Sequence, residues 1–165
     1  MGHEITGMGI KAGFLVFSAA AAWQDLRQHN VNAGLFTAAG IGGVLLRLWQ
    51  MIIYLMENGN GGALKSISAM GFDVALGMAV GGFLLLLSLI TKEAVGAGDG
   101  CFFLVSGIYL GFSKNLLLLG GGLLLCLPVS LSLFLVGMRK GVNVRNICFP
   151  FLPFVFPVGI GVIML

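Results

Sequence analysis

Residues 79–112 of the chain read AVGGFLLLLSLITKEAVGAGDGCFFLVSGIYLGF, two apolar runs joined by a short polar segment. Only Lys92, Glu93 and Asp99 carry a formal charge in this stretch. The whole chain of 165 residues is 9% charged and 58% hydrophobic, whereas soluble domains are about 25% charged. Its mean hydropathy is +1.05. Because so few charges cannot coat a soluble fold of this size, the sequence predicts an all-α integral membrane protein with a single domain over residues 1–165.

Six segments of the sequence are candidates to cross the membrane. A helix needs about 20 apolar residues to cross a hydrocarbon core of about 30 Å. Six such helices leave only short loops in a chain of this length, so no second, soluble domain is expected. The expected spans are Ile5–Trp23, Val31–Met56, Ser66–Ile90, a fourth span that ends near Phe112, Leu116–Met138 and Ile147–Leu165.

The fourth span is expected to hold an acidic residue within the membrane boundary. The stretch from Asp99 to Phe112 has 14 residues, and its helical length of about 21 Å is too short for a crossing. We therefore expect this helix to begin near Thr91 or Ala94, which would place Asp99 one to two turns inside. A carboxylate at such a depth costs up to about 3 kcal/mol and is rarely found there without a function.

The basic residues of the loops predict the orientation of the chain. Five of them fall on one side of the membrane and three on the other, so the positive-inside rule makes the first side cytoplasmic. Both termini are then extracytoplasmic, and a multi-pass protein of the cytoplasmic membrane is expected. The cytoplasmic set is Arg27, Lys92, Arg139, Lys140 and Arg145, and the opposite set is Lys11, Lys65 and Lys114.

Two aspartates are expected to meet at the cytoplasmic face. Asp25 follows the first span and Asp99 opens the fourth, so the two intervening spans return them to the same side. Two adjacent carboxyl groups cannot both ionise, so one stays an acid while the other acts as a base. Such a pair can activate a water for attack on a peptide carbonyl. Asp25 and Asp99 are therefore the candidate catalytic residues of an aspartic endopeptidase.

Three glycines surround the second aspartate. Gly96, Gly98 and Gly100 have no side chains, so another backbone can approach closely there. They are candidate substrate-binding residues, since a protease holds its substrate extended beside the carboxylates. The alternative is that these glycines only pack helices together, as small residues commonly do in membranes.

These residues also form motifs that resemble a known family. Gly96-Ala97-Gly98-Asp99 resembles the G-x-G-D signature of intramembrane aspartyl proteases. Asp25-Leu26-Arg27, followed by Val31-Asn32, resembles the first-aspartate motif of type IV prepilin peptidases, and Pro150–Phe154 resembles the segment that opens their last helix. The three elements follow the order and spacing of that family. The chain departs from it at Asn32, where proline is common, and at Cys101, where lysine is frequent.

The resemblance implies a function, a substrate and a set of partners. A member of this family would cleave the short basic leader of prepilin-like proteins at the cytoplasmic membrane face, with Asp25 and Asp99 as the catalytic pair and without a cofactor. The expected partners are a prepilin-like substrate and the lipid bilayer. Larger members carry a loop with paired C-x-x-C motifs and also methylate the product. The present sequence has no such motif, so methyltransferase activity is not expected.

Other classes of function find less support in the sequence. Lysine and arginine form no run typical of nucleic-acid binding, and Cys101, Cys126 and Cys148 lack the spacing of a metal site. The main alternative is a small transporter or channel component in which Asp25 and Asp99 transfer protons or cations. A non-catalytic assembly subunit is a third possibility. The sequence does not predict the oligomeric state.

Two further charges fall within the expected spans. Arg47 lies in the second span and Asp73 early in the third. Because charged side chains inside a membrane usually find partners, we expect these two to approach one another. Their position, away from the Asp25 and Asp99 face, favours a structural role over catalysis.

Overall fold

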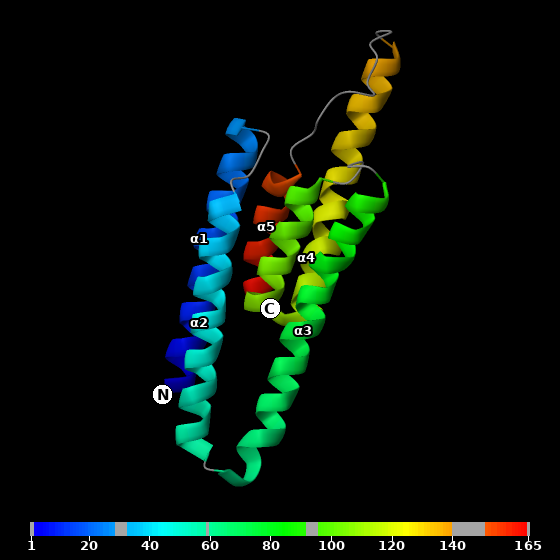
Figure 1. Cartoon of the computed structure of the whole chain (residues 1–165). Coiled ribbons are helices and arrows are strands. Elements are labelled where there is room, and N and C mark those ends of the chain that lie inside the picture. Colours follow the sequence, from blue (N-terminus) through cyan, green and yellow to red (C-terminus); the bar gives the residue numbers. More distant parts are fainter. Residues whose placement is uncertain (1, 29–32, 59, 92–95, 140–150, 165) are drawn as a thin grey trace.

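The computed structural model describes residues 2–28, 33–58, 60–91, 96–139 and 151–164. Within these ranges the chain forms helices only, in agreement with the all-α fold expected from the sequence. The helices are α1 (Gly2–Gln28), α2 (Ala33–Asn58), α3 (Asn60–Ile90), α4 (Ala97–Arg139) and α5 (Leu152–Met164). They lie side by side along a common axis (Figure 1).

Three described segments are long and apolar enough to cross a membrane, which makes this a membrane-embedded protein. They are Ala33–Glu57, Lys65–Ile90 and Ala97–Ser132. The expected first span falls in α1, which has 27 residues. The expected sixth span falls in α5, a helix of 13 residues, apart from residues 147–150 and 165, which lie outside the described residues.

Helix α4 consists of two segments that meet at Gly111 and run in opposite directions. Gly111 has φ 74° and ψ −174°, which interrupts the helix. The side chain of Asn115 donates a hydrogen bond of 2.9 Å to the carbonyl oxygen of Phe103. In a straight helix these residues would be about 18 Å apart along the axis. The chain therefore folds back at Gly111, and Figure 1 shows the green first segment (97–110) beside the yellow part of the second segment, which continues in orange to residue 139.

Glycines bring α3 into backbone contact with the first segment of α4. A Cβ atom added at Gly77 would lie 2.8 Å from the carbonyl oxygen of Gly107, and one added at Gly81 would overlap the backbone at Leu104. Small residues permit such close approach where helices pack in a membrane. Asn115, which is fully buried, also donates to the Gly77 carbonyl at 2.9 Å. This amide therefore links α3 to both segments of α4.

The hydrophobic core lies where α1, α4 and α5 meet. Phe17 of α1 stacks on Phe102 of α4, with ring centroids 5.2 Å apart, and Phe102 in turn contacts Phe103 edge to face at 5.4 Å. Offset or edge-to-face aromatic pairs add about 0.5–1.5 kcal/mol beyond their buried area. The largest apolar side chains that are almost completely buried are Phe14, Phe102, Phe103, Leu118, Leu152 and Val155.

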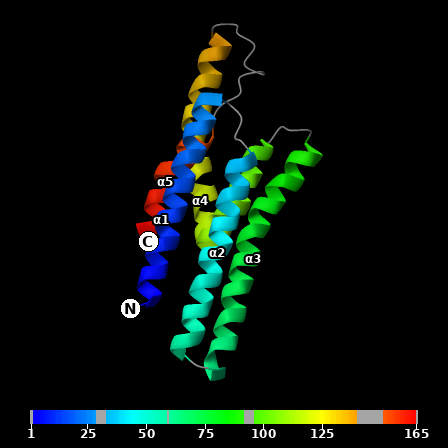
Figure 2. The ribbon, with the colours of Figure 1, turned by 60° about the vertical axis from the view of Figure 1, so that its left-hand side comes forward.

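The direction of the helices gathers several helix ends at one end of the bundle. Helices α1 and α3 finish there, and α2, α4 and α5 begin there, in both views (Figures 1 and 2). We call this the upper end. The expected start of the fourth span is wrong, because Thr91 follows α3 and α4 begins only at Ala97. Asp99 therefore lies in the first turn of its helix, and the backbone N–H of Asp99 donates to Gly96 at 3.0 Å.

Candidate functional site

Asp25 lies at the upper end of α1, on the face that packs into the bundle. Ala21 and Ser18, four and seven residues earlier, share this face and are buried. Asp25 itself is half-buried. Its Oδ2 atom accepts a hydrogen bond of 3.2 Å from the backbone N–H of Leu152, at the start of α5. This bond links the end of α1 to the start of α5, where the first N–H groups have no partner within the helix.

Asp99 lies at the upper end of α4 and also heads a buried face. Phe102, Phe103 and Ser106 follow it at helical spacing and are buried, while the Asp99 side chain is half-buried. The first turn of a helix favours a carboxylate, since its free N–H groups carry partial positive charge. A Cβ atom added at Gly96 would lie 3.3 Å from Oδ2 of Asp99. The absence of a side chain at Gly96 therefore keeps one side of this carboxylate open.

The two carboxyl groups lie close enough to interact electrostatically. They come from helices that are far apart in the sequence, and the upward path of α3 returns the chain to the end where α1 finishes (Figure 1). Each side chain is half-buried, so part of each carboxyl group is accessible from outside the protein. Two such groups can share one proton and act as an acid and a base. Their catalytic role stays a prediction.

The other two candidate glycines differ in their surroundings. A Cβ atom added at Gly98 would meet nothing within 4 Å, so this position faces open space. Gly100 is buried, and a Cβ atom there would lie 2.8 Å from the side chain of Leu85. The close packing of α3 on α4 thus requires glycine at position 100. Gly96 and Gly98 are the two that leave space beside Asp99.

A cysteine that the sequence did not single out lies near this site. Cys126 of the second α4 segment is half-buried and lies in the neighbourhood of the Asp99 carboxylate. It is 27 residues from Asp99 in sequence, and only the reversal at Gly111 brings the two together. Cys101, the departure from the family pattern, packs against the hydrophobic core instead. No pattern in the sequence links Cys126 to Asp99, because their proximity depends on the turn.

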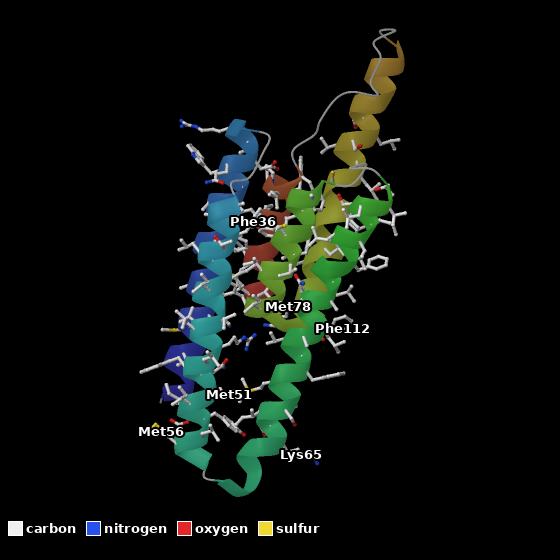
Figure 3. The ribbon with its side chains drawn as sticks, viewed as in Figure 1. Phe36, Met51, Met56, Lys65, Met78 and Phe112 are labelled. Atoms are coloured by element: carbon white, nitrogen blue, oxygen red, sulfur yellow. The ribbon has the colours of Figure 1, made fainter. Side chains whose placement is uncertain are left out.

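Arg47 and Asp73 both bind the turn of α4. Arg47 donates from Nε to the carbonyl oxygen of Ile108 at 2.8 Å and from Nη2 to that of Tyr109 at 2.7 Å. Asp73 accepts a hydrogen bond of 3.1 Å from the backbone N–H of Phe112, a residue labelled in Figure 3. The cation thus caps the end of one segment and the anion caps the start of the next.

This arrangement agrees with the structural role expected for these two charges. They interact electrostatically, but the hydrogen bonds just described go to the backbone of the turn. Each charge offsets the partial charge of the helix end that it faces. The pair therefore stabilises the reversal of α4 within the apolar part of the bundle.

Several residues of the sequence motifs lie outside the described residues. They include Val31 and Asn32 of the first-aspartate motif, Pro150 of the last motif, and three basic residues of the expected cytoplasmic loops: Lys92, Lys140 and Arg145. Within the described part of the chain, no group of three His, Cys, Asp or Glu side chains is arranged to hold a metal ion.

Comparisons with known proteins give no relative. No family model matches the chain, and no curated protein or solved structure matches it either.

Proposed function

We propose that the protein is an intramembrane aspartyl endopeptidase that cleaves the basic leader of prepilin-like proteins through Asp25 and Asp99. In this proposal the protein lies in the cytoplasmic membrane with six membrane segments, two of which are the segments of α4 that meet inside the bundle at Gly111. The upper end faces the cytoplasm and both termini are extracytoplasmic. The resemblance of the two aspartate motifs to type IV prepilin peptidases supports the choice of substrate.

The observation that carries the proposal is that two half-buried carboxyl groups, Asp25 near the end of α1 and Asp99 in the first turn of α4, lie at the same end of the bundle (Figure 1). In the proposed reaction the ionised carboxylate takes a proton from water, and the oxygen of that water attacks the carbonyl carbon of the scissile peptide. The protonated carboxyl group hydrogen-bonds the carbonyl oxygen and stabilises its developing charge. The C–N bond then breaks, and the leaving nitrogen receives a proton from the acid. The products are a free carboxylate and a free amine.

The surroundings of Asp25 support cleavage at a membrane face. Trp23 and Arg27 flank it on the outside of α1, and the Arg27 guanidinium lies 5.0 Å from the centre of the Trp23 ring. Both side chains are exposed. Tryptophan and arginine are typical of the boundary between the apolar core and the headgroups. A leader that lies in the cytoplasm and a transmembrane segment that lies in the bilayer would join at this level.

The space beside Asp99 supports an extended substrate. A Cβ atom at Gly98 would meet nothing within 4 Å, whereas one at Gly96 would crowd the Asp99 carboxylate, so glycine at both positions keeps this side open. Gly100 is buried, so the proposal assigns substrate contact to the other two glycines. The aromatic residues below, Phe17 and Phe102, are stacked and buried. They would close the site on its apolar side, so that water reaches the carboxyl groups only from the upper end.

The test is cleavage of a panel of prepilin-like proteins by the full chain, reconstituted in lipid and followed by mass spectrometry. The expected product lacks the basic leader. Asp25→Asn and Asp99→Asn each remove one member of the acid–base pair, so each is expected to lower the rate by about 10²–10⁴-fold or more. Glu57→Gln is the matched control, because it removes an exposed carboxylate at the far end of α2.

The outcomes distinguish the candidate functions. Cleavage that persists in both aspartate variants refutes the proposed mechanism. If the unaltered protein leaves every prepilin-like protein of the panel uncleaved, the choice of substrate is refuted. Proton or cation flux through vesicles that the same two substitutions abolish would assign the pair to transport.

A further inference from the structure

A cavity beside the turn of α4 gathers three basic side chains from three helical segments. It has a volume of about 170 Å³, and its polar lining consists of Lys11 of α1, Arg47 and Gln50 of α2, Tyr109, and Lys114 of the second α4 segment. None of the described lining residues is acidic. Asp73 interacts with Arg47 but does not line this cavity. The cavity therefore concentrates positive charge between helices.

The polar groups of this cavity are held in place with donors to spare. Arg47 uses Nε and Nη2 on two carbonyl groups and donates from Nη1 to Oε1 of Gln50 at 3.1 Å. Within the described residues these bonds occupy three of the five N–H donors of a guanidinium, so two remain. Gln50 is 7% exposed, and with its oxygen engaged, the amide nitrogen is its remaining donor. Two lysines add ammonium groups. Such a set of donors suits the oxygens of a phosphate group.

A second cavity adjoins the first at Arg47. It has a volume of about 200 Å³ and lies between α2 and α3, lined by apolar side chains except for Arg47 itself. Met51 of α2 and Met78 of α3, both labelled in Figure 3, contribute to it. Methionine adapts to flexible apolar partners. The Arg47 guanidinium thus lies between a cationic cavity and an apolar one. This arrangement suits a molecule with an anionic head and an apolar tail.

We infer that the cationic cavity binds the phosphate group of an anionic phospholipid, with an acyl chain against the apolar cavity. Basic pockets between membrane helices are known to take lipid headgroups. A volume of about 170 Å³ is below the roughly 300–1,000 Å³ typical of sites for whole drug-sized molecules, as expected for a headgroup alone. An anion there offsets the repulsion among the three cations. This inference is independent of the proposed peptidase activity.

The test uses the purified full chain in detergent, with dioleoylphosphatidylglycerol, dioleoylphosphatidylcholine or inorganic phosphate added. Native mass spectrometry counts the bound lipid, and thermal unfolding gives Tm. The anionic lipid is expected to remain bound and to raise Tm by about 5–10 °C near saturation, whereas the zwitterionic lipid with the same acyl chains does not. The double variant Lys11→Gln with Lys114→Gln leaves Arg47 on the turn and removes two cations. It should weaken binding by about thirtyfold.

Lys65→Gln is the matched control. Lys65 is exposed, lies near the lower end of α3 (Figure 3) and lines neither cavity, so this variant should bind lipid like the unaltered protein. Equal lipid binding by the double variant and the unaltered protein overturns the site, provided that circular dichroism shows both to be folded. A shift in Tm with inorganic phosphate but not with the anionic lipid overturns the lipid as the source of the phosphate.

Discussion

The substitution Gly111→Ala tests the reversal of α4 directly. Gly111 has φ 74° and ψ −174°, a region of backbone conformation that is essentially confined to glycine. A Cβ atom at this position would also lie 2.8 Å from Cγ of Asp73, whose carboxylate receives the N–H of Phe112. The added methyl group therefore strains the backbone and displaces the carboxylate that caps the second segment.

The expected loss can be worked from these two effects. A non-glycine residue in this region costs about 1–3 kcal/mol, and loss of a hydrogen bond to a charged group costs about 1.5–3 kcal/mol. We therefore expect the free energy of unfolding to fall by about 3 kcal/mol or more. For a chain of this size, Tm should fall by at least about 6 °C.

The assay is thermal unfolding in detergent, followed by circular dichroism, of Gly111→Ala beside two further variants. Asp73→Ala loses only the cap, so its Tm should fall less. Gly82→Ala is the matched control, because a Cβ atom at Gly82 would meet nothing within 4 Å and alanine favours a helix interior over glycine. Its Tm should be unchanged or higher.

A double variant separates the strain from the overlap. In Gly111→Ala with Asp73→Ala, the added methyl group no longer meets the Asp73 carboxylate, but the backbone strain at position 111 remains. The loss of unfolding free energy in the double variant should therefore be smaller than the sum of the losses in the two single variants. The reasoning is refuted if Gly111→Ala unfolds at the same temperature as Gly82→Ala.

Three further variants test the packing around this turn by the same unfolding measurement. Gly81→Ala places a methyl group in the backbone of α4 and should cost about 1–3 kcal/mol; a Tm equal to that of Gly82→Ala contradicts the close approach of α3. Asn115→Leu leaves buried polar groups without a partner and should cost at least about 1–3 kcal/mol, whereas Ser113→Ala, at an exposed position, should change little. Tyr109→Phe removes a hydrogen bond of 2.7 Å to α2 and should cost about 1 kcal/mol; no loss would show that this bond does not stabilise the fold.

The class of the fold could be predicted because it depends on composition. Chain length and the scarcity of charge are properties of the sequence alone, and a bilayer admits mainly helices for apolar segments of this length. The apolar run that ends near Phe112 also placed the break in α4 within a residue of Gly111. The predicted start of α4 was wrong, because the prediction assumed that one straight helix ending near Phe112 had to be long enough to cross the whole membrane.

The candidate site could be predicted in part. Counting helices places Asp25 and Asp99 at the same end, since each complete span reverses the chain. The contact of Asp25 with the N–H of Leu152 and the approach of Cys126 to Asp99 could not be predicted in this way. Both depend on how helices rotate and pack, and residues from distant segments carry no local signal of their contact.

Composition and the spacing of the apolar runs are enough to specify a helical membrane protein and to identify the few charges that it holds in apolar surroundings. What those charges do depends on how the helices pack. Asp73 and Arg47 became caps of a turn because the chain reverses at Gly111, where unpaired backbone groups inside an apolar bundle need partners. Lys11, Arg47 and Lys114, which lie far apart in the sequence, share one cavity beside this reversal. Helix packing determines such encounters, because only the folded bundle brings side chains from distant segments of the chain together.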